Sequence, residues 1–124
     1  MATASYLLLA QTGASGSTGN NSATLTANTN TILYQVPAST QTIVSTITVC
    51  NQASTAATFN IAVIKAGTTV ATQNYVAYGT PIAGNDTIAL TLGITLSNAG
   101  TGDTIVVYSS TSTLSFSAFG SQIA

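Results

Sequence analysis

The sequence has 124 residues, the length of one ordinary domain with a sizeable core. Charged residues make up 2% of it, against about 25% in an average soluble domain, and the formal net charge is −1. A single basic residue is too few for a surface that binds nucleic acid, and the lack of histidine excludes a Ser-His or Cys-His catalytic pair and the commonest transition-metal ligand.

The low charge also favours association between copies. The surface must consist mainly of Thr, Ser, Asn and Gln, which give little electrostatic repulsion. Charge is the usual protection of exposed strand edges against edge-to-edge pairing. A neutral, Thr-rich surface can be soluble too, but we expect this chain to act within an assembly and to form a homo-oligomer.

The N-terminal quarter differs in composition from the rest. Its cluster Tyr6-Leu7-Leu8-Leu9 is shorter than the ~7 apolar residues of a signal peptide, and no positive charge precedes it. Residues 12–31 are rich in Gly, Ser, Thr and Asn, and Leu25 is their only large apolar residue. We therefore predict an N-terminal arm and linker over residues 1–30 and a β-sandwich domain over residues 31–124. On the arm, Tyr6, Leu7, Leu8 and Leu9 are the predicted partner-binding residues.

The stretch from Thr42 to Lys65 carries the clearest strand pattern of the body. Apolar and polar residues alternate on both sides of the short polar segment 51–55, which is the period of two of a β-strand. We predict an antiparallel hairpin here, with the apolar faces of its two strands pointing the same way.

Extended patterns continue through residues 70–78, 87–96, 104–109 and 114–119, with a bulge expected at Gly93. No window has a helical period, and the pattern predicts roughly seven to nine short strands. The predicted fold class is all-β: a single antiparallel β-sandwich, jelly-roll or Ig-like, with an N-terminal arm. The predicted core consists of Ile43, Ile47, Val49, Phe59, Ile61, Val63, Ile88, Leu90, Leu92, Ile105, Val107, Leu114 and Phe116.

Few polar side chains are candidates for a site. Cys50 is the single cysteine and lies in a predicted strand, so we interpret it as a half-buried core residue rather than a reactive thiol. Asp86 and Asp103 each follow a turn and are possible Ca²⁺ ligands, but two isolated carboxylates are fewer than such a site uses, and capping of the local backbone is favoured. We expect no metal site, cofactor or catalytic residue.

The tyrosines allow two interpretations. Tyr34, Tyr75, Tyr78 and Tyr108 have the composition of an aromatic surface that binds carbohydrate. Tyrosine at a strand end more often forms the rim of a core, with its hydroxyl group in water. We favour the rim.

Seven short segments of the body are distinctive in their order rather than individually. They are residues 36–38 (VPA), 43–51 (IVSTITVCN), 57–63 (ATFNIAV), 74–78 (NYVAY), 85–88 (NDTI), 92–94 (LGI) and 119–121 (FGS). In this order they resemble a small β-sandwich module of tailed-bacteriophage virion proteins, especially those of cyanophages. The resemblance covers residues 32–121 and implies a virion structural protein without enzymatic activity. It transfers no functional residues.

The resemblance and the chain length favour a capsid decoration or cement protein, which binds the major capsid protein at the particle surface and stabilises the shell. Decoration proteins commonly sit on local symmetry axes, so a trimer is the expected oligomer. The alternative is a tail or fibre-tip accessory module that binds a host receptor or glycan. A fibre normally needs a shaft and an attachment domain, for which the roughly thirty residues before the body are too few. No nucleic-acid or membrane partner is expected.

Overall fold

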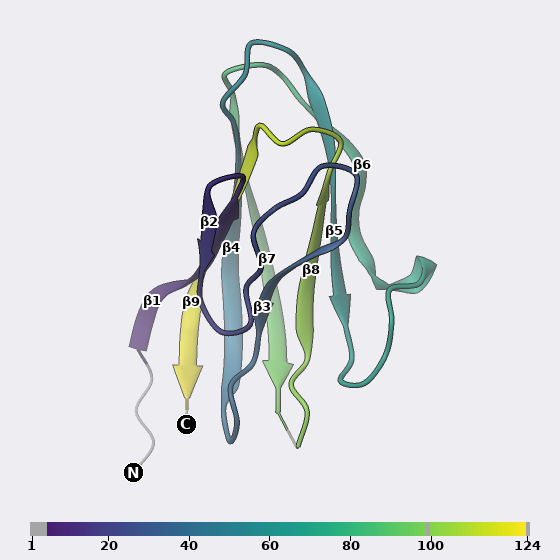
Figure 1. Ribbon diagram of the computed structural model, residues 1–124. Coiled ribbons are helices and arrows are strands. Elements are labelled where there is room, and N and C mark those ends of the chain that lie inside the picture. Colours follow the sequence, from purple (N-terminus) through teal and green to yellow (C-terminus); the bar gives the residue numbers. More distant parts are fainter. Residues whose placement is uncertain (1–4, 99, 124) are drawn as a thin grey trace.

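Two antiparallel sheets pack face to face in the computed structural model, which describes residues 5–98 and 100–123 (Figure 1). The elements are β1 (Ser5–Gly13), β2 (Gly16–Thr18), β3 (Thr31–Gln35), β4 (Gln41–Asn51), β5 (Ala57–Ile64), the 3-10 helix η1 (Thr72–Asn74), β6 (Tyr75–Ile82), β7 (Thr87–Ser97), β8 (Thr104–Ser109) and β9 (Leu114–Ile123). Sheet A has the order β2-β1-β9-β4-β7, and sheet B has the order β3-β8-β5-β6. Residues 1–4 of the predicted arm and residue 99 lie outside the described residues.

The strand order is that of a jelly roll. Apart from the short β2, the strands pair from the two ends of the chain inward: β1 with β9, β3 with β8, β4 with β7, and β5 with β6. This nesting, with β9 next to β4 and β8 next to β5, is a long hairpin wrapped into two sheets. The predicted all-β sandwich is therefore confirmed, and of its two predicted types the strand order matches the jelly roll.

The core lies between the sheets and follows the alternation of the strands. Of the predicted core residues, those fully enclosed are Ile47, Val49, Phe59, Ile61, Ile105, Val107, Leu114 and Phe116. Val63, Ile88, Leu90 and Leu92 are half-buried and pack against this cluster. β8 is buried on both faces, because the consecutive residues Ile105, Val106 and Val107 are all buried.

The predicted core position of Ile43 is wrong. Thr42 and Val44 face the core, and the side chain of Ile43 is 46% exposed on the outer face of sheet A. The cause is a bulge at Ser45, which lies between Val44 and Thr46 and has no register partner on β9. A bulge reverses the alternation of the strand, so Ile43 and Ile47 point to opposite faces although their spacing predicts the same face.

The predicted hairpin between residues 42 and 65 is also wrong, because its two strands belong to different sheets. β4 lies between β9 and β7 in sheet A, and β5 lies between β8 and β6 in sheet B. The connecting loop crosses from one sheet to the other and is held by Asn51. The Asn51 side chain donates to the carbonyl of Thr55 over 2.8 Å and accepts from the N–H of Ala53 over 3.1 Å.

The described part of the predicted arm belongs to the sandwich. β1 pairs with β9 from Ser5 opposite Gln122 to Thr12 opposite Phe116. Leu25, in the predicted linker, is buried in the common core. The segment therefore pairs its backbone and buries Leu9 and Leu25 within the same chain, and the sandwich extends across the boundary predicted at residue 30.

Candidate functional site: an outer apolar patch

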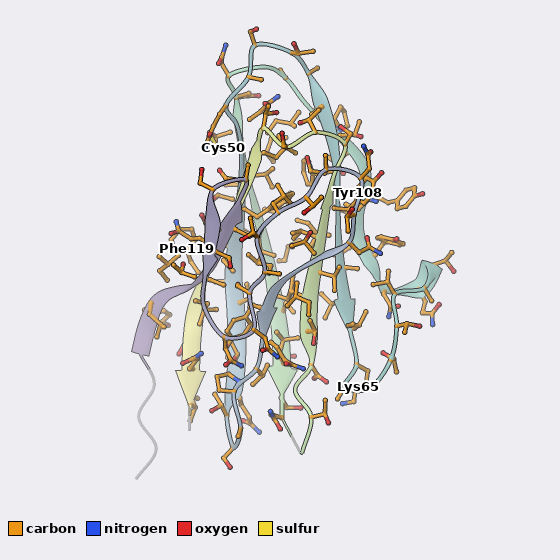
Figure 2. The ribbon with its side chains drawn as sticks, in the orientation of Figure 1. Cys50, Lys65, Tyr108 and Phe119 are labelled. Carbon is orange, nitrogen blue, oxygen red and sulfur yellow. The ribbon has the colours of Figure 1, made fainter. Side chains whose placement is uncertain are left out.

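The outer face of sheet A carries a group of large exposed apolar side chains. This outer apolar patch consists of Tyr6 and Leu8 from β1, Phe119 and Ile123 from β9, and Ile43 from β4. Tyr6 is 92% exposed and Phe119 is 37% exposed. Figure 2 shows Phe119 on the side of the molecule away from Tyr108, which lies in sheet B. The patch contains no charged residue.

Strand register brings the members of the patch together. Leu8 lies opposite Phe119, and Ser121 lies between Tyr6 and Ile43 as the register partner of both. Two irregularities create this arrangement: the bulge at Ser45 turns Ile43 outward, and a register shift between Leu8 and Ala10 sends their side chains to opposite faces. The patch is therefore a product of the bulged strands that meet at β9.

The predicted partner-binding residues do not stay together. Tyr6, Leu7 and Leu8 are exposed, as partner binding requires, whereas Leu9 is buried in the core of its own chain. Partner binding by the exposed members stays a prediction. Ile43 and Ile123 were missed as candidates, because the pattern of β4 placed Ile43 inside and nothing in the sequence separates Ile123 from a strand end.

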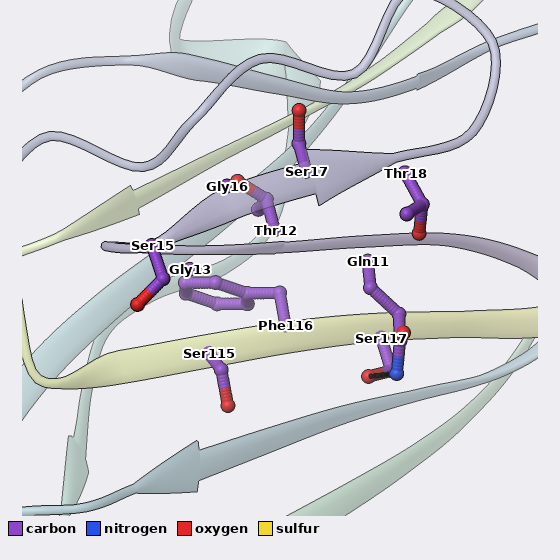
Figure 3. Close-up of a pocket in the computed structure, with 10 residues that line it drawn as sticks. All are labelled: Gln11, Thr12, Gly13, Ser15, Gly16, Ser17, Thr18, Ser115, Phe116 and Ser117. Carbon is purple, nitrogen blue, oxygen red and sulfur yellow. Dashed lines mark hydrogen bonds between the residues drawn. The ribbon is translucent and has the colours of Figure 1, made fainter.

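A second surface feature is a shallow depression between the β1–β2 hairpin and β9 (Figure 3). It has a volume of about 480 Å³ and is lined mainly by hydroxyl-bearing side chains and glycines. Across it, Gln11 Nε2 donates to Ser117 Oγ over 3.1 Å. The lining holds no titratable group, so it offers hydrogen bonds to a neutral ligand but no acid or base for catalysis.

The four tyrosines do not form one surface. Tyr34 is fully buried, and its hydroxyl lies 2.8 Å from Thr42 Oγ1 and accepts from Gln122 Nε2 over 2.6 Å. The expectation of a water-exposed rim position is wrong for this residue. The hydroxyl of Tyr108 donates to Asn28 Oδ1 over 3.0 Å. Only Tyr75 and Tyr78 contact each other, edge to face, with ring centroids 4.7 Å apart.

The Tyr75–Tyr78 pair lines a third hollow, of about 450 Å³, next to η1. Val70, Ala71 and Thr72 complete its wall. Tyr78 is 71% exposed, and the N–H of the following residue, Gly79, is held by Asn60 Oδ1 over 2.7 Å. An exposed aromatic ring beside uncharged polar groups has the chemistry to stack on a sugar ring.

The two carboxylates are engaged by backbone groups. Asp86 Oδ1 accepts from the N–H of Thr87 over 2.9 Å. Asp103 accepts from the N–H of Ala66 through Oδ1 over 3.0 Å and from the N–H of Ser97 through Oδ2 over 3.1 Å. Among the described residues, no group of three or more acidic, Cys or His side chains gathers to hold a metal. The interpretation as a cap of the local backbone is confirmed for Asp86, whereas Asp103 also holds the backbone of a distant segment at Ala66.

We expect Asp103→Asn to lower the free energy of unfolding by about 1–3 kcal/mol, because one of the two N–H groups would then face an amide NH₂ in a buried position. Lys65 lies 3.9 Å from Asp103, but its side chain is 78% exposed. Lys65→Met is therefore the matched control, with an expected change of at most about 1 kcal/mol. Urea denaturation measures both, and equal losses would assign the role of Asp103 to the ion pair instead.

Comparison of the chain with models of protein families, with curated proteins and with solved structures found no match. Within residues 5–98 and 100–123, no helix is long and apolar enough to cross a membrane. No relative therefore indicates a function, and the surfaces of the chain itself are the available guide.

Proposed function

We propose that this chain is a non-enzymatic structural protein of a tailed-bacteriophage particle, and specifically a capsid decoration or cement protein. In this proposal it binds the major capsid protein from the outside, in many copies, and stabilises the shell. The observation that carries the proposal is the outer apolar patch on a sandwich that is otherwise almost uncharged.

The patch supports protein binding on physical grounds. Contiguous exposed apolar side chains, rimmed by polar ones, mark surfaces that another protein covers. Hydroxyl-bearing side chains such as Ser45, Thr46 and Ser117 adjoin the patch on the same strands. An apolar centre with a polar rim is the usual anatomy of a protein interface.

The fold and the resemblance support the particle class. Jelly rolls occur in viral capsid domains, and also in lectins and cupins, so the fold is compatible with the proposal without selecting it. The ordered segments of residues 32–121 resemble cyanophage virion modules. The fold and the sequence resemblance are analogies with other proteins, whereas the outer apolar patch is a physical property of this chain.

Imaging of particles labelled with an antibody against this chain tests the location. The proposal expects label distributed over the shell, and label confined to the tail would contradict it. Isolated shells that lack the protein should also rebind it and resist heat better afterwards, because a ligand that binds only the assembled state stabilises that state.

We expect the double substitution Ile43→Thr and Phe119→Thr to weaken shell binding roughly 30-fold, or by about 2 kcal/mol. Both side chains are already partly buried, so only the remainder of their surface is lost from the interface. Threonine keeps the strand propensity and leaves folding intact. The matched control is Val76→Thr with Tyr78→Thr, which removes exposed apolar groups from β6 instead. Equal weakening by both pairs would remove the patch from the proposal.

The alternative function, a tail or fibre-tip module that binds a receptor or glycan, is favoured by the hollow beside Tyr75 and Tyr78. A glycan array probed with the isolated protein tests it. Binding that disappears in the Val76→Thr and Tyr78→Thr variant, and persists in the Ile43→Thr and Phe119→Thr variant, would support this function over decoration.

A further inference from the structure

Three of the four sheet edges are covered or interrupted over at least part of their length. On β3, the N–H of Ala23 donates to the carbonyl of Ile32, and the carbonyl of Asn20 accepts from the N–H of Gln35, both over 3.0 Å. Residues 20–23 thus cover this edge of sheet B. The other edge of sheet B, β6, contains Pro81, which has no N–H, and its pairing with β5 shifts register twice.

The β1 side of sheet A is also covered. β2 pairs with Gln11, Thr12 and Gly13, and Gly19 then lies so close to Leu9 and Ala10 that a Cβ on it would overlap them. The chain that follows β1 thus folds back along the free edge of residues 9–13, and among the described residues no such cover lies along residues 5–8. Such covers are the devices by which proteins protect sheet edges.

β7 is the long edge without such a device. Over residues 88–96 it contains no proline and no charged residue, and within the described residues the backbone of this stretch pairs only with β4. At the ends of β7, the N–H of Thr87 donates to Asp86 Oδ1 and the carbonyl of Ser97 accepts from the N–H of Asp103. Pairing of Thr87 with another strand therefore requires that Asp86 release this N–H. Two residues, Leu92 and Gly93, lie opposite the single Ser45, which leaves Thr87–Thr91 as a regular run. Alternate residues of an edge strand point their N–H and C=O groups away from their one partner.

We propose that β7 pairs antiparallel with β7 of a second copy of this chain, about a twofold axis at Ala89. The run Thr87-Ile88-Ala89-Leu90-Thr91 is nearly the same read in either direction. Centred on Ala89, the pairing sets Thr87 opposite Thr91, Ile88 opposite Leu90, and Ala89 opposite itself. The twofold axis sets residue i against j and j against i, as in any isologous contact, and here each residue also meets a partner of its own chemical kind.

The two faces of this ladder suit the pairing. Ile88 and Leu90 are half-buried at the open side of the core, so the dimer would enclose apolar surface that one chain leaves exposed. Thr87, Ala89 and Thr91 are exposed on the other face, where Thr–Thr pairs across strands are favourable. Stable interfaces bury roughly 1,200–2,000 Å² in total, and the half-buried row adds apolar area to the backbone pairing.

Charge does not oppose a second copy of this chain as the occupant. The charged residue nearest to the run, Asp86, would lie opposite Leu92 of the other copy. The two Asp86 side chains would then be about 20 Å apart along the ladder, well beyond the screening length of about 8 Å at physiological salt. No like charges meet at the contact.

A twofold contact closes a dimer. The trimer expected from the symmetry axes of shells needs two different surfaces that meet head to tail. The nearly palindromic run Thr87–Thr91 favours the dimer. This dimer would form in the isolated protein and does not depend on binding to a shell.

Sedimentation of the free protein tests the inference through Ala89→Lys, which places two like charges opposite each other on the axis. Ala89 is exposed, so the fold should be kept, as an unchanged circular dichroism spectrum would verify. The parent should sediment as a dimer of the 12.4 kDa chain at micromolar concentration, and Ala89→Lys as a monomer. The control Thr58→Lys adds the same charge at an exposed position in β5 and should stay dimeric. A monomeric or trimeric parent, or a dimeric Ala89→Lys variant, would overturn the inference.

Cysteine cross-linking tests the register, in a Cys50→Ser background that removes the native thiol. Ala89→Cys should be joined into a covalent dimer by a short bifunctional thiol reagent, because directly opposed Cβ atoms lie about 4.5–5.5 Å apart, slightly farther than the Cβ atoms of a disulfide. Thr87→Cys should cross-link when mixed with Thr91→Cys but not with itself. Self-linking of Thr87→Cys, or no linking of Ala89→Cys, would exclude this pairing.

Discussion

Phe59→Ala is expected to lower the free energy of unfolding by about 3–5 kcal/mol. Phe59 is fully buried in β5 and meets Phe116 of β9 edge to face, with ring centroids 6.0 Å apart and planes at 74°. This pair joins the two sheets across the core. Truncation removes the apolar contacts of one ring, leaves a cavity between the sheets and deprives the other ring of its aromatic partner.

The matched control for Phe59→Ala is Phe119→Ala, because Phe119 lies on the outer face of sheet A and is partly exposed. Its loss should lower the free energy of unfolding by about 1–2 kcal/mol, clearly less than that of Phe59, because part of the ring is already in water and no enclosed cavity is left. Urea denaturation of both variants gives the comparison. Similar losses in the two would mean that the sandwich does not depend on the contact between its sheets at Phe59.

Gly120→Ala is expected to destabilise the fold by about 3 kcal/mol or more, at the upper end of the range for overpacking. A Cβ at this position would overlap the carbonyl oxygen of Ile43 on the neighbouring strand. That atom belongs to the backbone, so it cannot move aside as the end of a side chain does. Gly120 also lies opposite Val44 and Leu7, in the strand between β1 and β4.

The control for Gly120→Ala is Gly13→Ala. The nearest atom to a Cβ at Gly13 is Ser115 Cβ at 3.6 Å, an ordinary contact. A Gly-to-Ala change that fits the native backbone commonly stabilises by about 0.4–1 kcal/mol. The two substitutions should therefore have opposite signs in a thermal melt, and a stable Gly120→Ala variant would show that β4 and β9 can separate at low cost.

The sequence predicts the fold class and most of the core because these depend on the alternation of each strand. Phe59, Ile61, Leu114 and Phe116 are found buried as their spacing predicts. Errors arise where local pattern cannot carry the information. The pattern of residues 42–65 is the same for a hairpin and for two strands in different sheets, and only the partners β7, β9, β6 and β8 decide between them.

The candidate site was less predictable than the fold. The exposure of Tyr6 and Leu8 agrees with their predicted role, but their pairing with β9 joins residues more than a hundred positions apart. Composition indicates that residues 12–31 are loop-like, yet it says nothing about what β1 packs on. Ile43 belongs to the patch because of the bulge at Ser45, and neither Ser45 nor its neighbours signals a bulge in the sequence.

The place of β9 between β1 and β4 has a consequence for synthesis of the protein. The β4–β7 and β5–β6 pairs join segments that leave the ribosome early, whereas β1 must wait for the final described strand before sheet A can close. Pairing between such distant segments is slow to form. Because the outer apolar patch draws its residues from β1, β9 and β4, it comes into being only in that last step. An incomplete nascent chain therefore lacks the finished patch, so the binding that we propose for this surface would be restricted to copies that have completed their fold.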